Sequence, residues 1–222
     1  MLWRAVVRLD PKKGADVKKD TAFEAANRRS AEALARSDWG KKSLSGHERN
    51  RFFLSRAGTQ FTDLSLLSGA DHKGDGRAMA LLDYNGDGCL DMAVANTNKP
   101  SLVLFRNELR LKRPVIAIRL TGGAKVNRDA IGARVTVRTG ARMQVRELQA
   151  GEGNAAQNSK TLIFGLGEAA SAESVTVRWP DGQIQDLGAV AGGSDVSVRQ
   201  GEAPVVQAYG MAAAAPGNDK GQ

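Results

Sequence analysis

The most informative segment of this chain is Asp83-Tyr84-Asn85-Gly86-Asp87-Gly88-Cys89-Leu90-Asp91. Oxygen-bearing side chains stand at its first, third, fifth and ninth positions, and glycines stand at the fourth and sixth. Hard cations such as Ca²⁺ bind several oxygen ligands on a tight, flexible loop. Without a cation, the three carboxylates would repel one another. The spacing therefore predicts a Ca²⁺ site with the ligands Asp83, Asn85, Asp87, Asp91 and the backbone carbonyl of Cys89.

The segments on both sides of this loop are short and apolar, which is typical of strands. They are residues 78–82 and 92–95. An EF-hand would need flanking helices and a Glu at position 12, where this chain has Val94. The pattern therefore predicts a strand–loop–strand metal hairpin. An ordinary hairpin stays open as an alternative, because Asn-Gly and Asp-Gly are favoured turn pairs. Such a turn would leave Asp83 and Asp91 unexplained.

The composition of the chain favours a turn-rich β protein. Its 222 residues include 25 glycines, and aromatic residues make up only 5%. The length allows one large or two small domains. We predict a basic N-terminal segment (1–50) with a short helix near 21–38, a blade-like unit (51–113), a C-terminal β-sandwich (114–200) and a disordered tail (201–222). A capping-box pattern at Thr21–Glu24 marks the start of the predicted helix.

Residues 114–200 contain about seven short segments with strand patterns separated by turns, which is typical of a sandwich or barrel. Within this region, Val175, Val177 and Trp179 alternate with polar residues, so we expect them to face a core. Ahead of the metal loop, residues 51–55 and 60–64 indicate a β-hairpin, and residues 101–105 indicate one more strand after it. The predicted fold class is therefore mainly β, with one propeller-type blade joined to a sandwich.

Four motifs in the second half of the chain match a known family in order and spacing. They are Asn127-Arg-Asp-Ala-Ile-Gly-Ala-Arg-Val135, Gly151-Glu-Gly153, Phe164-Gly-Leu-Gly167 and Val177-Arg-Trp-Pro-Asp-Gly182. Residues from about 115 to 200 therefore resemble an ASPIC/UnbV domain, as in the cartilage acidic protein-like family. Residues 51–107 resemble one FG-GAP/VCBS-type repeat, the blade unit of integrin-like β-propellers. The repeat's matching elements include Phe61-Thr-Asp63, the Asp83–Asp91 loop and Leu104-Phe-Arg-Asn107.

This resemblance implies a function in binding or adhesion. In the family, the carboxylates of the repeat bind Ca²⁺, which implies the same role for Asp83, Asn85, Asp87 and Asp91. The domain has no established enzymatic activity, so the resemblance implies a non-enzymatic module for a protein or carbohydrate ligand, usually exported to an extracellular or periplasmic location. Because family members carry several repeats, a single blade is expected to pack on the sandwich, on further repeats or on a second copy.

Charge and targeting signals bear on the partners that this chain would have. Residues 1–50 hold twelve Lys and Arg against seven Asp and Glu, so most of the net charge of +8 lies there. No nucleic-acid motif accompanies that charge, so a solvated segment is favoured over nucleic-acid binding. We expect no membrane span and no signal peptide in residues 1–10. A genuine start at Met1 would imply a cytoplasmic protein, whereas a shortened start would explain both the single repeat and the missing export signal.

An enzyme is the main alternative to a binding module. A metal-dependent hydrolase of a carbohydrate or phosphate ester would need a catalytic pair or a second metal near the loop. Asp71 and Asp75 form a second acidic pair that keeps this alternative open, although an ordinary turn explains them better. The two histidines, His47 and His72, have no neighbour that suggests a nucleophile. We therefore predict no catalytic residues.

Overall fold

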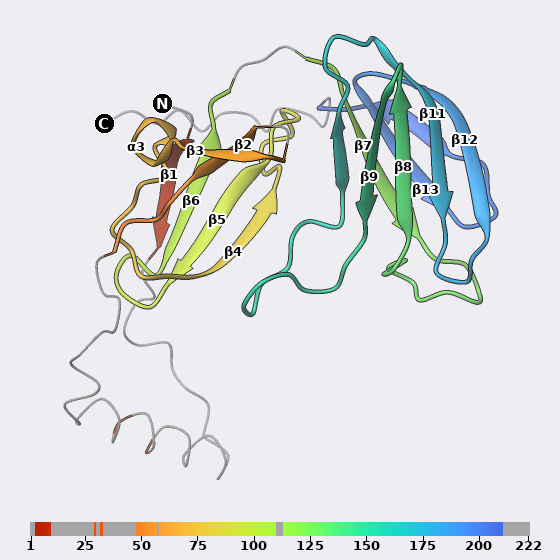
Figure 1. Ribbon diagram of the computed structural model, residues 1–222. Helices are drawn as coiled ribbons and strands as arrows, with labels where there is room; N and C mark the ends of the chain where they lie inside the picture. The colour runs from red at the N-terminus through yellow and green to blue at the C-terminus, as the bar shows by residue number, and fades with distance from the viewer. Residues whose placement is uncertain are drawn as a thin grey trace, which may run out of the picture. The chain divides into compact units, whose positions relative to one another are not determined.

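The computed structural model describes residues 3–9, 29, 32, 48–56, 58–109 and 113–210 (Figure 1). These residues form a mainly β structure, as the composition predicts. The chain divides into two compact units. The first unit comprises residues 1–78 and 93–106, and the second comprises residues 79–92 and 107–222. The predicted metal loop therefore belongs to the second unit, although it lies within the sequence of the blade-like segment.

The loop connects β4 and β5, two strands of a four-stranded sheet with the order β1-β6-β5-β4. Its strands are β1 (Trp3–Leu9), β4 (Gly76–Leu82), β5 (Asp91–Asn96) and β6 (Leu102–Asn107). Alternate side chains of β5 and β6 are buried, including Val94, Val103 and Phe105. This burial follows the period of two that strands impose on side chains.

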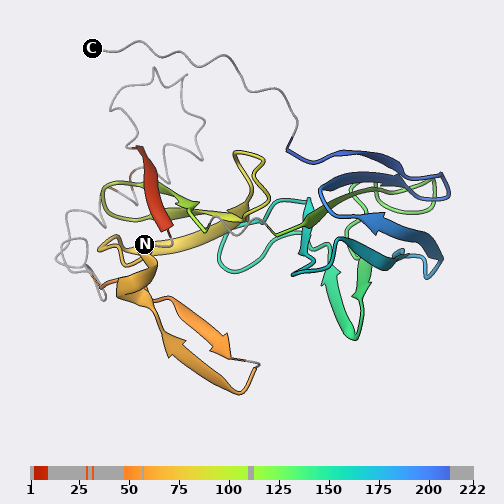
Figure 2. The same cartoon turned by 90° about the horizontal axis from the view of Figure 1, so that it is seen from above.

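A separate two-stranded hairpin lies between β1 and β4 in the chain. It consists of β2 (Phe53–Arg56) and β3 (Gln60–Asp63), paired antiparallel, and the one-turn helix α3 (Ser65–Ser68) follows. In Figure 2 the hairpin, drawn in orange, extends away from α3. Large apolar side chains here are exposed, with Phe61 69% and Leu66 81% accessible.

Two elements of the first unit differ from the sequence-based prediction. The strand β1 lies within residues 1–50, which we predicted as a basic segment with one helix. Arg4 and Arg8 interrupt the apolar pattern there, so the sequence carries no clear strand period. The single turn α3 is too short to give a helical period. Of the predicted helix at 21–38, only Arg29 and Glu32 are described, both as helical, and the rest lies outside the described residues.

The first sheet of the second unit has the order β10-β7-β13-β14. The central pair is parallel, with Ile116 of β7 opposite Ser194 of β13, whereas the outer pairs are antiparallel. The parallel pair joins segments almost eighty residues apart in the sequence. The strands are β7 (Val115–Thr121), β10 (Leu162–Gly165), β13 (Ser194–Arg199) and β14 (Val205–Ala208).

The second sheet of this unit is antiparallel throughout, with the order β12-β11-β8-β9. Val175 of β11 stands opposite Val137 of β8, so the apolar positions of neighbouring strands share one face. The strands are β8 (Arg134–Thr139), β9 (Arg142–Glu147), β11 (Ser171–Arg178) and β12 (Ile184–Ala191).

One hydrophobic core receives side chains from both sheets of the second unit. The predicted inward positions are confirmed, because Val175 and Val177 are fully buried and Trp179 is 2% exposed. The indole nitrogen of Trp179 donates to Gln185 Oε1 at 3.0 Å, which satisfies its only polar group. Further core residues are Ile116, Ile118, Val135, Val137, Phe164, Val196 and Val198.

The predicted disordered tail is wrong for its first ten residues. The strand β14 pairs with β13 through Val206 opposite Val196, and Tyr209 and Gly210 follow it. The side chains of β14 are exposed, so its sequence shows no buried face, and backbone pairing holds the strand. Residues 211–222 lie outside the described residues. In the described part of the chain, no helix has the length and apolar character to cross a bilayer.

Candidate metal centre

The predicted metal loop connects two neighbouring strands, β4 and β5. The strand–loop–strand prediction is therefore confirmed, and neither flank is helical. Gly86 and Gly88 have φ values of 71° and 85°, a region that side chains with a Cβ rarely adopt. The two glycines therefore let the loop turn sharply around its first residue.

Asp83 is the acceptor around which the loop folds. Its Oδ1 accepts hydrogen bonds from the amides of Gly86 at 2.8 Å and Asp87 at 3.1 Å. Its Oδ2 accepts one from the Gly88 amide at 2.7 Å and one from the Tyr209 hydroxyl at 2.6 Å. The negative charge of Asp83 thus lies against three consecutive backbone N–H dipoles, an arrangement that holds anions in protein loops.

Asn85 and Asp87 form a second set of short-range contacts on the outer side of the loop. Asn85 Oδ1 accepts from the Asp87 amide at 3.2 Å, and its Nδ2 donates to Asp87 Oδ2 at 2.8 Å. Asp87 Oδ1 accepts from the Cys89 amide at 2.8 Å. Both side chains are thereby ordered within the loop, while the Sγ of Cys89 donates to the carbonyl oxygen of Leu109 at 3.3 Å.

Asp91 lies at the start of β5 and is completely buried. Its Oδ1 accepts from the Asn107 amide at 2.8 Å, and its Oδ2 accepts from the Tyr84 amide at 3.1 Å. These bonds fasten the end of β6 and the beginning of the loop to one carboxylate. A buried carboxylate without such partners would be strongly unfavourable.

The electrostatic environment of the loop opposes further negative charge. Burial raises the pKa of Asp91, the amides of Asn107 and Tyr84 lower it, and the nearby Asp87 and Asp83 raise it again. Burial and the same carboxylates raise the pKa of the Cys89 thiol to about 11. Within the described residues, no Lys or Arg forms an ion pair with any of the three carboxylates.

The donor set fits a hard cation in chemistry, because its side chains offer only oxygen ligands. The arrangement of the side chains is not that of a formed coordination sphere. Across the described ranges, no three acidic, histidine or cysteine side chains gather in a group that could hold a metal ion. Instead the carboxylates of Asp83, Asp87 and Asp91 are turned onto backbone amides. Binding of Ca²⁺ by these residues would therefore require their side chains to rotate toward a common point.

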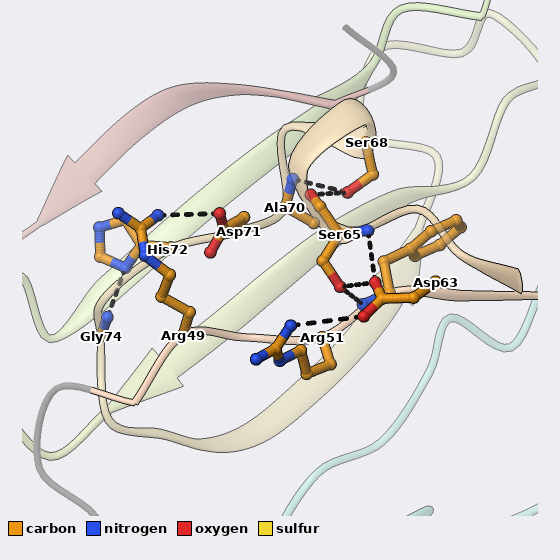
Figure 3. A network of polar contacts seen from close by, with 10 residues as sticks. Arg49, Arg51, Asp63, Ser65, Ser68, Ala70, Asp71, His72 and Gly74 are labelled. Atoms are coloured by element: carbon orange, nitrogen blue, oxygen red, sulfur yellow. Dashed lines mark hydrogen bonds and ion pairs between the residues drawn. The ribbon is translucent and has the colours of Figure 1, made fainter.

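The second acidic pair does not extend this centre. In Figure 3, Asp71 accepts from Arg49, with Nη1 and Oδ2 2.8 Å apart, and His72 Nδ1 accepts from the Gly74 amide at 2.9 Å. Asp75 pairs with Arg77 at 2.8 Å and accepts from the Thr97 hydroxyl at 2.6 Å. Each carboxylate thus has a cationic partner in the first unit. These contacts give both carboxylates a structural role in the first unit.

The same network joins the end of β3 to the first residue of α3. Asp63 Oδ1 accepts from the Ser65 amide at 2.9 Å and from the Ser65 hydroxyl, and Arg51 lies 3.3 Å from Asp63 Oδ2 (Figure 3). The Ser65 contacts are the main reason that the pKa of Asp63 lies below its ordinary value. This cluster therefore has a structural role at the end of β3.

Residues distant in sequence complete the surroundings of the metal loop. Asn158 Oδ1 accepts from the Leu81 amide at 2.7 Å, and the Ser159 amide donates to the Leu81 carbonyl at 2.8 Å. The hydroxyl of Tyr209 donates to Asp83 Oδ2. Sequence reasoning missed Tyr209, because it follows a strand with no buried face inside the predicted tail. Only its position directly before a glycine in a turn was available as a signal.

A polar recess of about 350 Å³ lies beside Asp83 and Gly86. It is also lined by Arg119 and Asp195, which form an ion pair across the parallel strands β7 and β13. Arg119 Nε donates to the Thr161 hydroxyl at 3.2 Å as well. The remaining lining residues are Gln207, Ala208, Tyr209 and Gly210.

Comparison with known proteins supports one of the two predicted resemblances. Residues 123–205 match the family described as "ASPIC and UnbV", which confirms that resemblance for this part of the chain. The likeness of residues 51–107 to an FG-GAP/VCBS repeat stays a prediction. No curated protein matches the sequence.

Among solved structures, the chain is similar to one described as a "putative cell adhesion protein" from Bacteroides uniformis ATCC 8492. The two share 14% identity over 60% of this chain and 66% of that chain, with a TM-score of 0.21. A third of that protein's length thus has no counterpart here, and a likeness this slight carries no argument.

Proposed function

We propose that this protein is a non-enzymatic, calcium-binding β module that presents a surface to a protein or carbohydrate ligand. One observation carries the proposal: three carboxylates and an amide side chain share the β4–β5 loop, and no basic residue of the described chain pairs with them. Within the described residues these carboxylates accept only from uncharged N–H and O–H groups, so a bound cation would relieve their mutual repulsion. Oxygen ligands on a glycine-containing loop are the chemistry that Ca²⁺ prefers.

The proposed ion would be held by Asp83, Asn85, Asp87, Asp91 and the carbonyl oxygen of Cys89. It would supply positive charge to neutralise the carboxylates. The residues of the chain already order the backbone of the loop, while the carboxylates would have to turn toward the ion. Asp83 gathers the amides of the turn, and Asp91 joins the loop to the end of β6. Calcium would therefore stabilise a hairpin whose backbone is already defined.

For the finer architecture, we propose that residues 51–107 form one blade of the FG-GAP/VCBS type and that the second unit is a β-sandwich. Support for the blade comes from the sheet in which β4, β5 and β6 are consecutive neighbours. Support for the sandwich comes from two four-stranded sheets that share one core. The family resemblance favours an extracellular or periplasmic location, with further repeats or a second copy as additional partners.

The chemistry of the ligand is indicated by the recess beside the loop. Its lining combines the guanidinium of Arg119, the carboxylate of Asp195 and the amide of Gln207. Such groups offer hydrogen bonds in both directions, which suits the hydroxyl groups of a carbohydrate or a polar peptide segment better than an apolar ligand.

The first experiment is a thermal unfolding series with added Ca²⁺ and with EDTA. We expect Ca²⁺ to stabilise the wild-type protein by about 2.7 kcal/mol at a free concentration one hundred times the Kd. Asp87→Ala should abolish this Ca²⁺-dependent shift, because it removes a charged ligand.

Asp186→Ala is the matched control for this series. Asp186 accepts from the amide two residues ahead, that of Gly188 at 2.9 Å, as Asp87 does from Cys89. The control therefore loses the same kind of local hydrogen bond at an exposed position of the edge strand β12, which has no proposed ligand role. It should keep the full Ca²⁺ shift. Equal melting temperatures of the wild type in Ca²⁺ and in EDTA would exclude the proposed site.

A further inference from the structure

We propose that the outer face of the sheet β12-β11-β8-β9 binds an acidic polysaccharide through three arginines on its two central strands, β8 and β11. We call this surface the arginine face, and its residues are Arg134, Thr136, Arg138, Ser174, Thr176 and Arg178. The inference rests on the proposed function in one respect, because it names the class of carbohydrate that the module would bind. It involves neither calcium nor residues 83–91, so each proposal can fail without the other.

The side chains of the arginine face point away from the core of the second unit. Val135 and Val137 of β8 are fully buried. The same holds for Val175 and Val177 of β11. Because successive side chains of a strand point to opposite faces, the residues that alternate with these valines lie on the outer side of the sheet. The strands β12, β11, β8 and β9 lie side by side in one layer (Figure 1), and all three arginines are exposed.

The strand register places two of the arginines directly opposite each other. Arg134 of β8 stands opposite Arg178 of β11. Arg138 follows four residues after Arg134 in the same strand, about 13 Å away at the rise of a β-strand. Like charges directly opposite each other destabilise a sheet. The free protein therefore carries an unfavourable contact that an anionic ligand would relieve.

The three arginines are not neutralised from within the described part of the chain. None of them forms an ion pair or a side-chain hydrogen bond with a described residue. Arg178 stands opposite Ile184 of the edge strand β12. Arg138 stands opposite Met143 of the edge strand β9. Both of these neighbours are apolar, so neither edge strand supplies a counter-charge at these two positions.

Three carboxylates border the arginine face without pairing with it. They are Glu147 of β9, Glu173 of β11 and Asp186 of β12. Asp186 accepts from the Gly188 amide at 2.9 Å. Glu173 accepts from the Gly140 amide at 3.1 Å. Glu147 stands opposite Arg134 and offsets part of its charge, but these two described side chains form no ion pair. Positive charge therefore predominates along the two central strands.

The groups on the arginine face determine which ligand fits it. A guanidinium has five N–H donors in a planar fork and no acceptor, which matches the oxygens of a carboxylate or a sulfate group. The hydroxyls of Thr136, Ser174 and Thr176 lie among the arginines and can exchange hydrogen bonds with sugar hydroxyls. A polysaccharide that carries anionic groups at intervals could contact both the opposed arginine pair and Arg138.

Other anionic partners fit this face less well. None of its six residues is aromatic, so it lacks the rings on which the bases of a single-stranded nucleic acid stack. The major groove of duplex DNA admits a helix or a two-stranded ribbon, whereas this sheet has four strands. A protein interface has a hydrophobic centre and a polar rim. Here the centre is polar, and the exposed apolar side chains lie on the edge strands: Met143, Val145 and Ile184.

The deciding experiment is a titration of fluorescently labelled polysaccharides with the full chain in EDTA, followed by anisotropy. The probes are polygalacturonate, which carries carboxylates, dextran sulfate, which carries sulfates, and neutral dextran. We expect at least one acidic polymer to bind, more weakly as NaCl is added, and neutral dextran not to bind. The acidic polymer that binds more tightly identifies the anionic group. Binding of neither acidic polymer, or equally tight binding of dextran, would overturn the proposal.

The double variant Arg134→Gln/Arg178→Gln removes the opposed pair and keeps side chains that can form hydrogen bonds. We expect the Kd for the acidic polymer to rise roughly tenfold or more, the range for losing hydrogen bonds between charged groups. An unchanged Kd would show that the polymer binds elsewhere and would contradict the assignment of this face.

The matched control is the double variant Arg113→Gln/Arg128→Gln. It removes the same number of charges from exposed side chains of the second unit, which pair with Glu168 and Asp129. Since these positions lie outside the arginine face, the Kd should change by less than about twofold. Equal losses of affinity in the two double variants would mean that net charge alone attracts the polymer, and the proposed face would then be wrong.

A stability measurement separates a role in binding from a role in folding. Without polymer, Arg134→Gln/Arg178→Gln should melt at the wild-type temperature or above it, because a pair of like charges is removed. Arg138→Gln, which lies outside that pair, is the second variant and should raise the Kd roughly threefold to tenfold. If the double variant melts at a lower temperature, Arg138→Gln decides, and an unchanged Kd in that variant would refute the proposal.

Two competing ligands test the choice of partner. Duplex DNA and vesicles that contain phosphatidylserine are titrated in the same buffer. If either binds more tightly than both acidic polysaccharides, and if Arg134→Gln/Arg178→Gln removes that binding, the face is a nucleic-acid or membrane surface and the proposal is wrong. Because every titration contains EDTA, a failure of the proposed calcium site would leave these results unchanged.

Discussion

At the scale of single residues, Asp91 and Asp129 show how the surroundings of a carboxylate decide its ionisation. Asp91 is buried near two other carboxylates, and its pKa is raised. Asp129 accepts from the ammonium of Lys160 at 2.6 Å and lies 3.3 Å from the guanidinium of Arg128, so its pKa is lowered. The folded state therefore favours the protonated form of one residue and the ionised form of the other.

The Asp129 contact makes a prediction about acid sensitivity. Because its folded pKa is depressed, Asp129 contributes stability above its unfolded pKa, and this contribution is lost as the pH falls through the folded pKa. Lys160→Ala should raise the pKa of Asp129 toward the ordinary value, since Lys160 is the largest cause of the shift. Carboxyl chemical shifts in an NMR pH titration measure this directly.

Arg128→Ala serves as the comparison for that titration. Arg128 is a smaller cause of the same shift, and its side chain is 87% exposed. Its removal should therefore move the pKa of Asp129 less than removal of Lys160. An equal or larger change would mean that the exposed pair, rather than the Lys160 hydrogen bond, sets the ionisation of Asp129.

At the scale of elements, strands differ in how much of their side-chain surface is buried, and only strands with buried side chains contribute to a hydrophobic core. Phe164 of β10 is fully buried beneath the guanidinium of Arg146, whose carbon lies 5.5 Å from the ring centre. Phe61 of β3 is 69% exposed on the hairpin. Both are phenylalanines in four-residue strands, yet only the first contributes to the core of its unit.

The corresponding prediction compares two truncations of the same side chain. Phe164→Ala should lower the free energy of unfolding by about 3–5 kcal/mol, because it leaves a cavity in a close-packed core. Phe61→Ala should change it by less than about 0.5 kcal/mol. Urea denaturation measures both effects when it is followed through the amide signals of β11 for Phe164→Ala and of β6 for Phe61→Ala, so that each variant is observed in its own unit. Similar losses in the two variants would contradict the assignment of the core.

The elements also show which parts of the fold could be predicted from sequence. Alternating valines marked β8, β11 and β13, because each strand buries one face. The edge strand β14 has no buried face, so its pattern carried no signal. The same limit applies to the site. The candidate ligands of residues 83–91 could be predicted because they lie within nine consecutive residues, whereas the contact of Tyr209 with Asp83 joins residues 126 positions apart and depends on the tertiary fold.

At the scale of the whole molecule, the units do not follow the order of the chain. Residues 79–92 lie within the blade-like segment by sequence but belong to the second unit by contact. A ligand of this loop is therefore expected to stabilise the second unit, since binding to the native state alone shifts its unfolding equilibrium.

Hydrogen exchange with mass spectrometry tests this expectation in the full chain. Addition of Ca²⁺ should slow exchange in β11, a core strand of the second unit, more than in the exposed β2–β3 hairpin of the first. Global opening governs exchange in core strands, so they report ligand stabilisation of their own unit. Equal protection of both regions would mean that the two units unfold together.

The parallel pairing of β7 with β13 has a consequence for synthesis of the protein. Both hydrogen-bonding neighbours of β7 follow it in the chain, with paired residues of β10 between 44 and 50 positions later and those of β13 78 positions later. A nascent polypeptide leaving the ribosome must therefore hold Ile116 and Ile118 without their final partners until residue 199 has emerged. Pairings at such separation form slowly, and the waiting apolar segment is a natural client for a chaperone.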